Sequence, residues 1–137
     1  MVSAVSSFSV KKKIYYYDTD AGGVVYYANY LKVLEEARTE LCLSRGVDTA
    51  AWFQKGFAFV VVHISVDYKA PAQYGDIIEA TARVEKVGNS SIHFAQEILK
   101  DNTLLVKAAV IWACIDTKSF KVQPVPDEIR KALAGGA

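Results

Sequence analysis

The sequence has 137 residues, of which 52% are apolar, and its formal net charge at pH 7 is +1. A near-neutral chain gives no electrostatic basis for binding nucleic acid or a membrane surface, and no stretch approaches the run of about 18 apolar residues that a membrane span needs. The length predicts one domain, residues 1–137, and the high apolar content favours association between subunits.

The N-terminus and the cysteines indicate a cellular compartment. Residues 1–8 lack the charged start and long apolar stretch of a secretory signal. Cys42 and Cys114 have no metal-type spacing and are expected to be buried free thiols. Together these features predict a cytoplasmic protein.

The first part of the chain predicts a strand, a turn and a long helix. Residues 8–17 alternate between two faces, as a strand does, and their Lys11-Lys12-Lys13 run is expected to be a solvated strand edge rather than a phosphate site. The turn Asp-Thr-Asp-Ala-Gly-Gly occupies residues 18–23. Apolar residues then recur at steps of three and four over 27–45, which predicts one amphipathic helix, and Gly46 is a stop signal.

The remainder of the chain predicts strands joined by short turns. The expected elements are a weakly helical connector (49–56), four strands (58–68, 76–87, 91–99, 104–116) and a last short helix (126–133). Short polar turns favour antiparallel pairing, because parallel strands need long crossovers. The predicted fold is α+β in the order β-α-β-β-β-β, with the helix on one face of an antiparallel sheet.

Two strands suggest that the second face of the sheet is covered as well. Residues 106–115 are apolar on both alternating faces, with Ala109, Ile111 and Ala113 opposite the face that would meet the helix. In the strand 58–68, Phe59 and Val61 are expected on that same outer face. Because an uncovered apolar sheet face needs a partner, the pattern predicts a homo-oligomer, either a homodimer or a homotetramer.

Asp18 and Asp20 lie on the glycine turn just before the long helix. Free N–H groups at a helix start can polarise a carbonyl oxygen, while a carboxylate beside them acts as a base or a nucleophile. Either acid could instead cap the helix or the turn, which is a common role of Asp at such a place. The residues alone leave both roles open.

The motif that contains these acids resembles a known family. Residues 18–30 (Asp-Thr-Asp-Ala-Gly-Gly-Val-Val-Tyr-Tyr-Ala-Asn-Tyr) and 35–40 (Glu-Glu-Ala-Arg-Thr-Glu) resemble the acyl-CoA thioesterases of the hotdog fold. They are most similar to the 4-hydroxybenzoyl-CoA thioesterase family and its Tol-Pal-associated branch, as is the segment 59–76. The resemblance spans about residues 8–130. It implies a sheet wrapped around one long central helix and hydrolysis of an acyl-CoA thioester to the free acid and CoA.

The resemblance also implies roles for four residues. The second acid of the motif is catalytic in that family, so Asp20 would attack the thioester carbonyl or activate water, while Asp18 is expected to keep a capping role. The N–H of Tyr27 would polarise the carbonyl oxygen, Gly23 would allow close approach, and Tyr26 would border the substrate. No metal or organic cofactor is implied. The site would form between two subunits and take acyl-CoA or an acyl carrier protein thioester, with the acyl group (short-chain, hydroxybenzoyl or dihydroxynaphthoyl) left open.

Two departures from the family pattern concern the site. The Tol-Pal-associated branch usually carries His where this chain has Tyr27, a change that leaves the role of the backbone N–H intact. The hydroxybenzoyl branch holds the CoA phosphates with a basic cluster between its third and fourth strands, and residues 87–91 contain no such cluster. Lys86 or backbone N–H groups would then hold the phosphates.

Three alternatives stand beside this interpretation. An apolar strand that ends in Asp-x-Asp also occurs in magnesium-dependent phosphotransferases of the haloacid-dehalogenase type, but these need a parallel sheet with several crossover helices. A hotdog dehydratase needs a His near the central helix, whereas His63 and His93 lie in predicted strands and are expected to be non-catalytic. A catalytically silent acyl-binding or scaffolding hotdog protein is the third, and the intact Asp20 argues against it.

Overall fold

A computed structural model describes residues 8–134. Residues 1–7, where no signal peptide is predicted, and residues 135–137 lie outside the described part. The strands are β1 (Ser9–Lys13), β2 (Phe57–Tyr68), β3 (Ile77–Thr81), β4 (Arg83–Val87), β5 (Ser91–Lys100) and β6 (Thr103–Asp116). The helices are the short 3-10 helix η1 (Tyr16–Asp18), α1 (Asn29–Ser44), α2 (Thr49–Gln54) and α3 (Asp127–Ala134).

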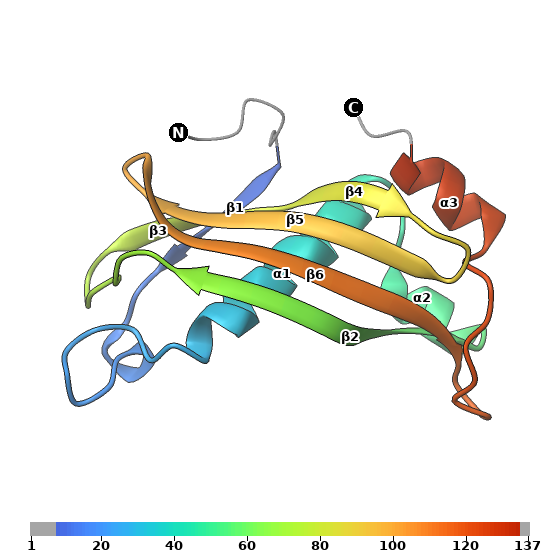
Figure 1. The fold of residues 1–137 in the computed structure, drawn as a ribbon, viewed down its shortest axis with the longest axis horizontal. Coiled ribbons are helices and arrows are strands. Elements are labelled where there is room, and N and C mark those ends of the chain that lie inside the picture. Colours follow the sequence, from blue (N-terminus) through green and yellow to red (C-terminus); the bar gives the residue numbers. More distant parts are fainter. Residues whose placement is uncertain (1–7, 135–137) are drawn as a thin grey trace.

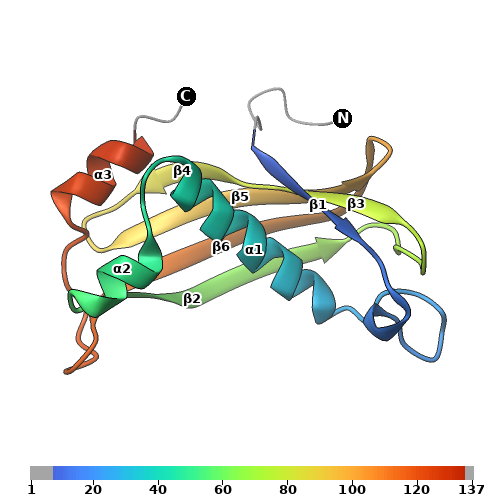
Figure 2. The ribbon, with the colours of Figure 1, turned by 180° about the vertical axis from the view of Figure 1, so that it is seen from behind.

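The strands form one antiparallel sheet against which α1 lies. Within residues 8–134 the sheet has six strands in the order β1-β3-β5-β6-β2, with β4 paired to β5. Figures 1 and 2 show α1 crossing one face of this sheet, while α3 lies at the end of the molecule opposite the turn that precedes α1. The predicted architecture, an antiparallel sheet around one long helix, is confirmed.

Three predicted elements differ from the structure in extent. The first strand ends at Lys13 instead of continuing to residue 17, because the Asp18 carboxylate accepts the Tyr15 N–H and closes η1. The helix begins at Asn29 rather than residue 27. The single strand predicted over 76–87 is two strands, β3 beside β1 and β5, and β4 beside β5. The predicted order β-α-β-β-β-β therefore lacks one strand.

Strand β2 contains a bulge that the sequence pattern does not reveal. Its pairing with β6 shifts between Val61 and His63, so one extra residue, Val62, is inserted. An inserted residue reverses which side chains face the helix. Before the bulge, Phe59 packs its ring on Trp112 on the helix side, 5.7 Å between centroids, and Val61 pairs with Trp112. The expectation that Phe59 and Val61 face away from the helix was wrong for this reason.

The core lies between α1 and the inner face of the sheet. The helix buries a stripe of side chains spaced by three and four residues, among them Tyr30, Leu34, Ala37 and Leu41. Every second residue of β6 faces it: Val106, Ala108, Val110, Trp112 and Cys114. Removing each large apolar side chain from water stabilises the fold by about 1.5–3 kcal/mol.

A buried polar contact crosses this core. The Arg38 guanidinium donates to Gln96 Oε1 at 2.9 Å, and Gln96 Nε2 donates to the Leu34 carbonyl at 3.0 Å. Both side chains are almost fully buried. The contact ties α1 to β5 at a fixed register, because each buried polar group there needs its partner.

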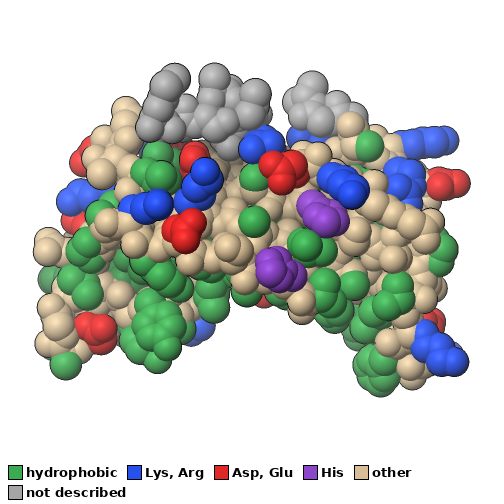
Figure 3. All heavy atoms as spheres, in the orientation of Figure 1, with side chains coloured by type: hydrophobic (Ala, Val, Ile, Leu, Met, Phe, Trp, Pro, Cys, Tyr) green, Lys and Arg blue, Asp and Glu red, His purple; other side chains and the backbone are tan. Residues whose placement is uncertain are grey.

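The opposite face of the sheet is covered by no described element. Figure 3 shows this outer face, with two histidines near its centre and hydrophobic side chains along the edge where β2 runs. His63 and His93 flank Ile111 in one row across β2, β6 and β5. Ala109, Ile111 and Ala113 lie on this face, as predicted, and both histidines lie away from the helix.

The cysteine expectation is confirmed. Cys42 and Cys114 are buried and free, and burial raises the pKa of Cys42 to about 12 and that of Cys114 to about 11. The described helices include none that is both long and apolar enough to cross a membrane.

Candidate active site

Asp18 holds the chain between β1 and α1 in place. It is 7% exposed, and its Oδ2 accepts the Tyr15 N–H at 2.8 Å and the Lys12 ammonium at 3.1 Å. Its backbone carbonyl accepts hydrogen bonds from the Tyr26 N–H at 3.0 Å and from Asn29 Nδ2 at 2.9 Å. Asp18 thus joins β1 to the start of α1, and its predicted structural role is confirmed.

Asp20 lies two residues later, at the exposed tip of the same turn. Its N–H donates to the Val24 carbonyl and its carbonyl accepts the Gly23 N–H, both at 3.0 Å. Oδ1 accepts the Gly22 N–H at 2.8 Å, whereas Oδ2 has no hydrogen-bond partner among residues 8–134. Gly23 has a φ of 80°, where a side chain would strain the backbone. The turn fixes the Asp20 backbone and leaves one carboxylate oxygen free.

Free N–H groups follow in the turn before α1. Asn29 donates to the Tyr26 carbonyl at 2.8 Å, and Tyr30 donates to the Tyr27 carbonyl at 3.3 Å. The N–H groups of Tyr27 and Ala28 have no acceptor in the described part of the chain. The predicted oxyanion donor, Tyr27, is therefore free, although it precedes the helix instead of beginning it.

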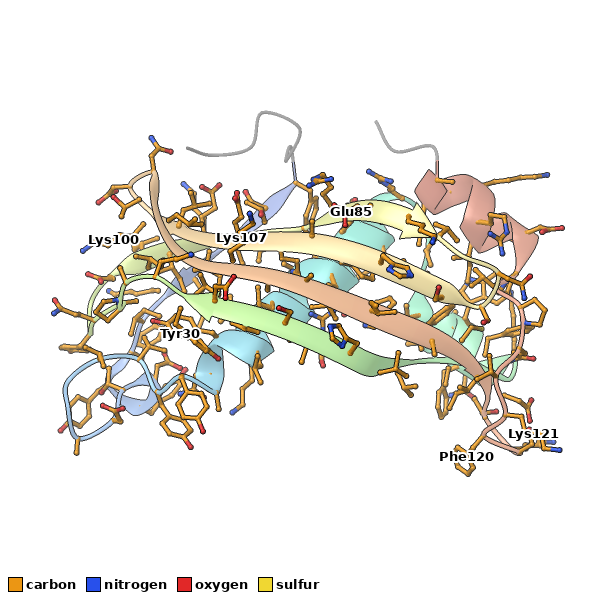
Figure 4. The ribbon with its side chains drawn as sticks, in the orientation of Figure 1. Tyr30, Glu85, Lys100, Lys107, Phe120 and Lys121 are labelled. Carbon is orange, nitrogen blue, oxygen red and sulfur yellow. The ribbon has the colours of Figure 1, made fainter. Side chains whose placement is uncertain are left out.

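A small cavity, here called the tyrosine pocket, has Tyr27 in its wall. Its volume is about 270 Å³, and it is lined by Val25, Tyr27, Tyr30, Tyr68, Lys69, Ala70 and Pro71. The Tyr68 hydroxyl donates to the Tyr27 carbonyl at 3.4 Å, and the Tyr30 hydroxyl accepts the Ala72 N–H at 3.0 Å. Figure 4 shows Tyr30 at the end of the molecule that carries the turn. These bonds join the start of α1 to the end of β2.

A larger cavity, here called the helix pocket, also lies between α1 and β2. Its volume is about 530 Å³. The residues that line it come from α1, α2, β2 and β6, and include Glu35, Thr39, Phe53, Phe59, Val61 and Trp112. Both cavities adjoin the edge strand β2, which has no second neighbour among the described strands.

The four predicted site residues lie in the loop between η1 and α1: Asp20 and Gly23 in its first turn, Tyr26 and Tyr27 in the turn that leads into α1. The rings of Tyr26 and Tyr27 are 4.9 Å apart between centroids. The pKa of Tyr26 is raised, chiefly by the neighbouring Tyr27 phenol, and further by burial and by the negative charge of Asp20. Tyr26 therefore keeps its phenol proton beside the Asp20 carboxylate.

Sequence reasoning did not identify Tyr30, Tyr68 and Lys69 as neighbours of this turn. They reach it from α1 and from the end of β2, and β2 is brought there by its pairing with β6. Lys86, the expected phosphate contact, lies on β4, whose end meets α3 through the bond from Arg130 to the Val87 carbonyl at 3.4 Å. Figure 1 places that end of β4 opposite the turn.

The chain is similar to known thioesterases over most of its length. A family model described as the thioesterase-like superfamily matches residues 15–133. The acyl-CoA thioester hydrolase YbgC of Escherichia coli is 38% identical over 118 residues, which cover 85% of this chain and 88% of that protein. The 1,4-dihydroxy-2-naphthoyl-CoA hydrolase of Nostoc punctiforme is 33% identical over 124 residues, with 90% and 84% covered.

A solved structure extends the agreement to three dimensions. The crystal structure of a 1,4-dihydroxy-2-naphthoyl-CoA thioesterase from Synechocystis matches with a TM-score of 0.85 and 27% identity, covering 93% of this chain and 95% of that one. The predicted hotdog fold and the predicted enzyme class, a thioester hydrolase, are confirmed. The chain belongs to the thioesterase-like superfamily.

Proposed function

We propose that the protein hydrolyses an acyl-CoA thioester to the free acid and CoA, with Asp20 as nucleophile or general base. The observation that carries the proposal is the free Oδ2 of Asp20 in the same loop, residues 19–28, as the free N–H groups of Tyr27 and Ala28. The similarity to acyl-CoA thioester hydrolases supports the substrate class.

The geometry suits two forms of the reaction. As a general base, Asp20 takes a proton from water, hydroxide adds to the thioester carbonyl carbon, and the C–S bond breaks as the CoA sulfur leaves and takes up a proton. As a nucleophile, Asp20 adds to the carbonyl itself, the C–S bond breaks and the CoA thiolate leaves and takes up a proton; water then hydrolyses the resulting anhydride to the free acid and the Asp20 carboxylate. In both forms the carbonyl oxygen becomes an oxyanion, and the Tyr27 N–H donates a hydrogen bond to it.

The two cavities divide the substrate between them in this proposal. The tyrosine pocket, which Tyr27 lines, receives the thioester and the chain that carries its sulfur. The helix pocket receives the acyl group, and its aromatic side chains Phe53, Phe59 and Trp112 suit an aromatic or short-chain acyl group. Acyl carrier protein thioesters are the second donor class to test.

We further propose that the cytoplasmic enzyme works as a homodimer or homotetramer. Val60, Val61, Val62 and Ile64 are consecutive or near-consecutive exposed residues on the edge strand β2. An exposed apolar edge strand readily pairs with another chain, and a second copy there would lie against both cavities. Light scattering that gave a mass near 15.1 kDa, that of one chain, for fully active protein would contradict the shared site.

The main experiment is a panel of acyl-CoA substrates followed by release of the CoA thiol. Wild-type protein should hydrolyse at least one aromatic or short-chain acyl-CoA, and Asp20→Asn should hydrolyse the same substrate at least about 10²-fold more slowly. EDTA should leave the rate unchanged, because the proposed chemistry uses a carboxylate and backbone N–H groups. A rate that required added magnesium would support the phosphotransferase alternative instead.

A further inference from the structure

The proposed substrate carries phosphate groups. Lys86, the residue predicted to bind them, lies far from the tyrosine pocket of the same subunit. Lys86 pairs across from His93 on the outer face of the sheet, at the end of β4 that meets α3. The residues that line the tyrosine pocket lie around the start of α1 and the end of β2, and these segments lie at the other end of the molecule (Figures 1 and 2). A phosphate linked to a thioester at the tyrosine pocket therefore needs a cation at that end.

Lys69 is a cation at the tyrosine pocket. It is the one charged residue among those that line the pocket. Its N–H and that of Ala70 both donate to the Leu105 carbonyl, at 2.7 and 3.2 Å, which fixes the backbone where β2 ends. Lys69 is exposed, so its ammonium is accessible to a ligand in solvent.

The Lys69 ammonium is also unpaired, unlike those of Lys12 on β1 and Lys100 on β5. Lys12 bonds to Asp18 at 3.1 Å and Lys100 bonds to Asp76 at 2.9 Å. Lys69 has no ion pair or side-chain hydrogen bond within residues 8–134. The described contacts therefore give the Lys69 charge no structural role, and the ammonium is available to a ligand.

We propose that Lys69 binds the phosphate at the end of the pantetheine chain, with that chain lying along Tyr27, Tyr30 and Tyr68. The inference rests on the proposed function. Pantetheine is uncharged and fits a pocket with apolar and aromatic walls, and an ammonium is a strong point donor to a phosphate. CoA and the prosthetic arm of an acyl carrier protein both carry this phosphate, so the substrates in the test must separate the two sources.

The test compares thioesters that share the acyl group and the pantetheine chain and differ only in the group at the far end of that chain. Lys69→Gln should raise KM about tenfold for acyl-CoA and leave kcat within about twofold. The same acyl group on pantetheine, which has no phosphate, should show no change in KM. Lys69→Arg should restore most of the affinity for acyl-CoA, and Lys131→Gln on α3 is the matched control that removes an exposed lysine elsewhere. If only the acyl carrier protein thioester responds to Lys69→Gln, the phosphate belongs to the carrier protein.

Two outcomes would overturn the inference. One is an equal rise in KM for acyl-CoA and acyl-pantetheine, which would assign Lys69 to packing of the pocket. The other is a phosphate-specific effect of Lys86→Gln with none from Lys69→Gln. Calorimetric binding of free CoA separates this inference from the proposed function: a wild-type protein that binds CoA, with about tenfold weaker binding by Lys69→Gln, supports the Lys69 contact even if no thioester is hydrolysed.

Discussion

Asp18 and Asp20 are two residues apart in one motif, yet their surroundings are opposite. The Asp18 carboxylate is buried and bonded to the Tyr15 N–H and the Lys12 ammonium. The Asp20 carboxylate is exposed, with one oxygen bonded to Gly22 and the other free. The Asp18 carboxylate therefore stabilises the local fold through its hydrogen bonds. The Asp20 carboxylate keeps one oxygen without a hydrogen bond, and that oxygen is available for chemistry.

The largest effect should come from Asp20→Asn. The amide keeps the size of the side chain and an oxygen for the Gly22 N–H, but it is neither a base nor a nucleophile. Turnover of acyl-CoA should fall about 10²-fold or more, while the thermal unfolding midpoint stays within about one degree of wild type. Steady-state thiol release and calorimetry on the same preparation measure both quantities.

The second largest effect should come from Asp18→Asn, which should lower stability and leave turnover nearly unchanged, the reverse of Asp20→Asn. The substitution removes the charge that pairs with Lys12 inside a partly buried contact, so the free energy of unfolding should fall by about 1–3 kcal/mol. Turnover, measured well below the unfolding temperature, should stay within a few-fold of wild type because the Asp18 carbonyl still accepts the Tyr26 N–H. A loss of turnover with unchanged stability would reverse the roles assigned to the two acids.

The helix and its buried stripe could be predicted from the sequence because the necessary signal is local. Tyr30, Leu34, Ala37 and Leu41 recur at the helical period, and the structure buries all of them. The turn with Asp20 could be located for the same reason, since its glycines and acids are adjacent along the chain.

Other features depend on pairing between distant segments. The run Val60-Val61-Val62 is apolar on both alternating faces, so it carries no local signal of the bulge, which becomes visible only in the pairing with β6. The division of 76–87 into β3 and β4 appears only in the pairing, where β1 pairs with β3 and β5 pairs with both segments. Lys69 reaches the tyrosine pocket only after β2 has paired, so no local pattern identifies it.

Two adjacent glycines provide a smaller test of what surrounds Asp20. A Cβ on Gly23 would meet no atom within 4 Å, but its φ of 80° disfavours a side chain. Gly23→Ala should therefore lower stability by about 1–2 kcal/mol. A Cβ on Gly22 would lie 3.2 Å from Asp20 Oδ1, so Gly22→Ala should displace the carboxylate and lower turnover several-fold, since small misplacements of a catalytic group are costly.

The glycine pair is informative because the two substitutions add the same atom group. Urea unfolding separates their stabilities, and turnover at saturating acyl-CoA separates their effects on chemistry. If Gly22→Ala leaves turnover at the wild-type value, the position of the Asp20 carboxylate is not as critical as its free oxygen suggests.

The smallest effect should come from a third aspartate, Asp76, whose carboxylate is bonded as fully as that of Asp18. Its oxygens accept the Gln73 N–H at 2.8 Å and the Lys100 ammonium at 2.9 Å. These bonds fix the loop whose Ala72 carbonyl accepts the Val25 N–H, next to the Asp20 turn. If a carboxylate whose two oxygens are both bonded has a structural role, Asp76→Asn should lower stability and leave turnover unchanged.

The pH dependence of that change arises from the pKa of Asp76. Burial raises this pKa, but the Gln73 N–H and the Lys100 ammonium outweigh burial and lower it below the ordinary value. The folded state therefore favours the ionised carboxylate. Its contribution is present above the unfolded pKa of about 3.9 and is lost as the pH falls through the lower folded value. Because Lys100 is partly exposed, the contribution at neutral pH should be only about 0.2–1 kcal/mol.

Urea unfolding between pH 3 and 7 should show the stabilities of wild type and Asp76→Asn converging at the acid end. Lys100→Gln should show part of the same loss of stability. A difference between wild type and Asp76→Asn that stays constant down to pH 3 would contradict the assignment.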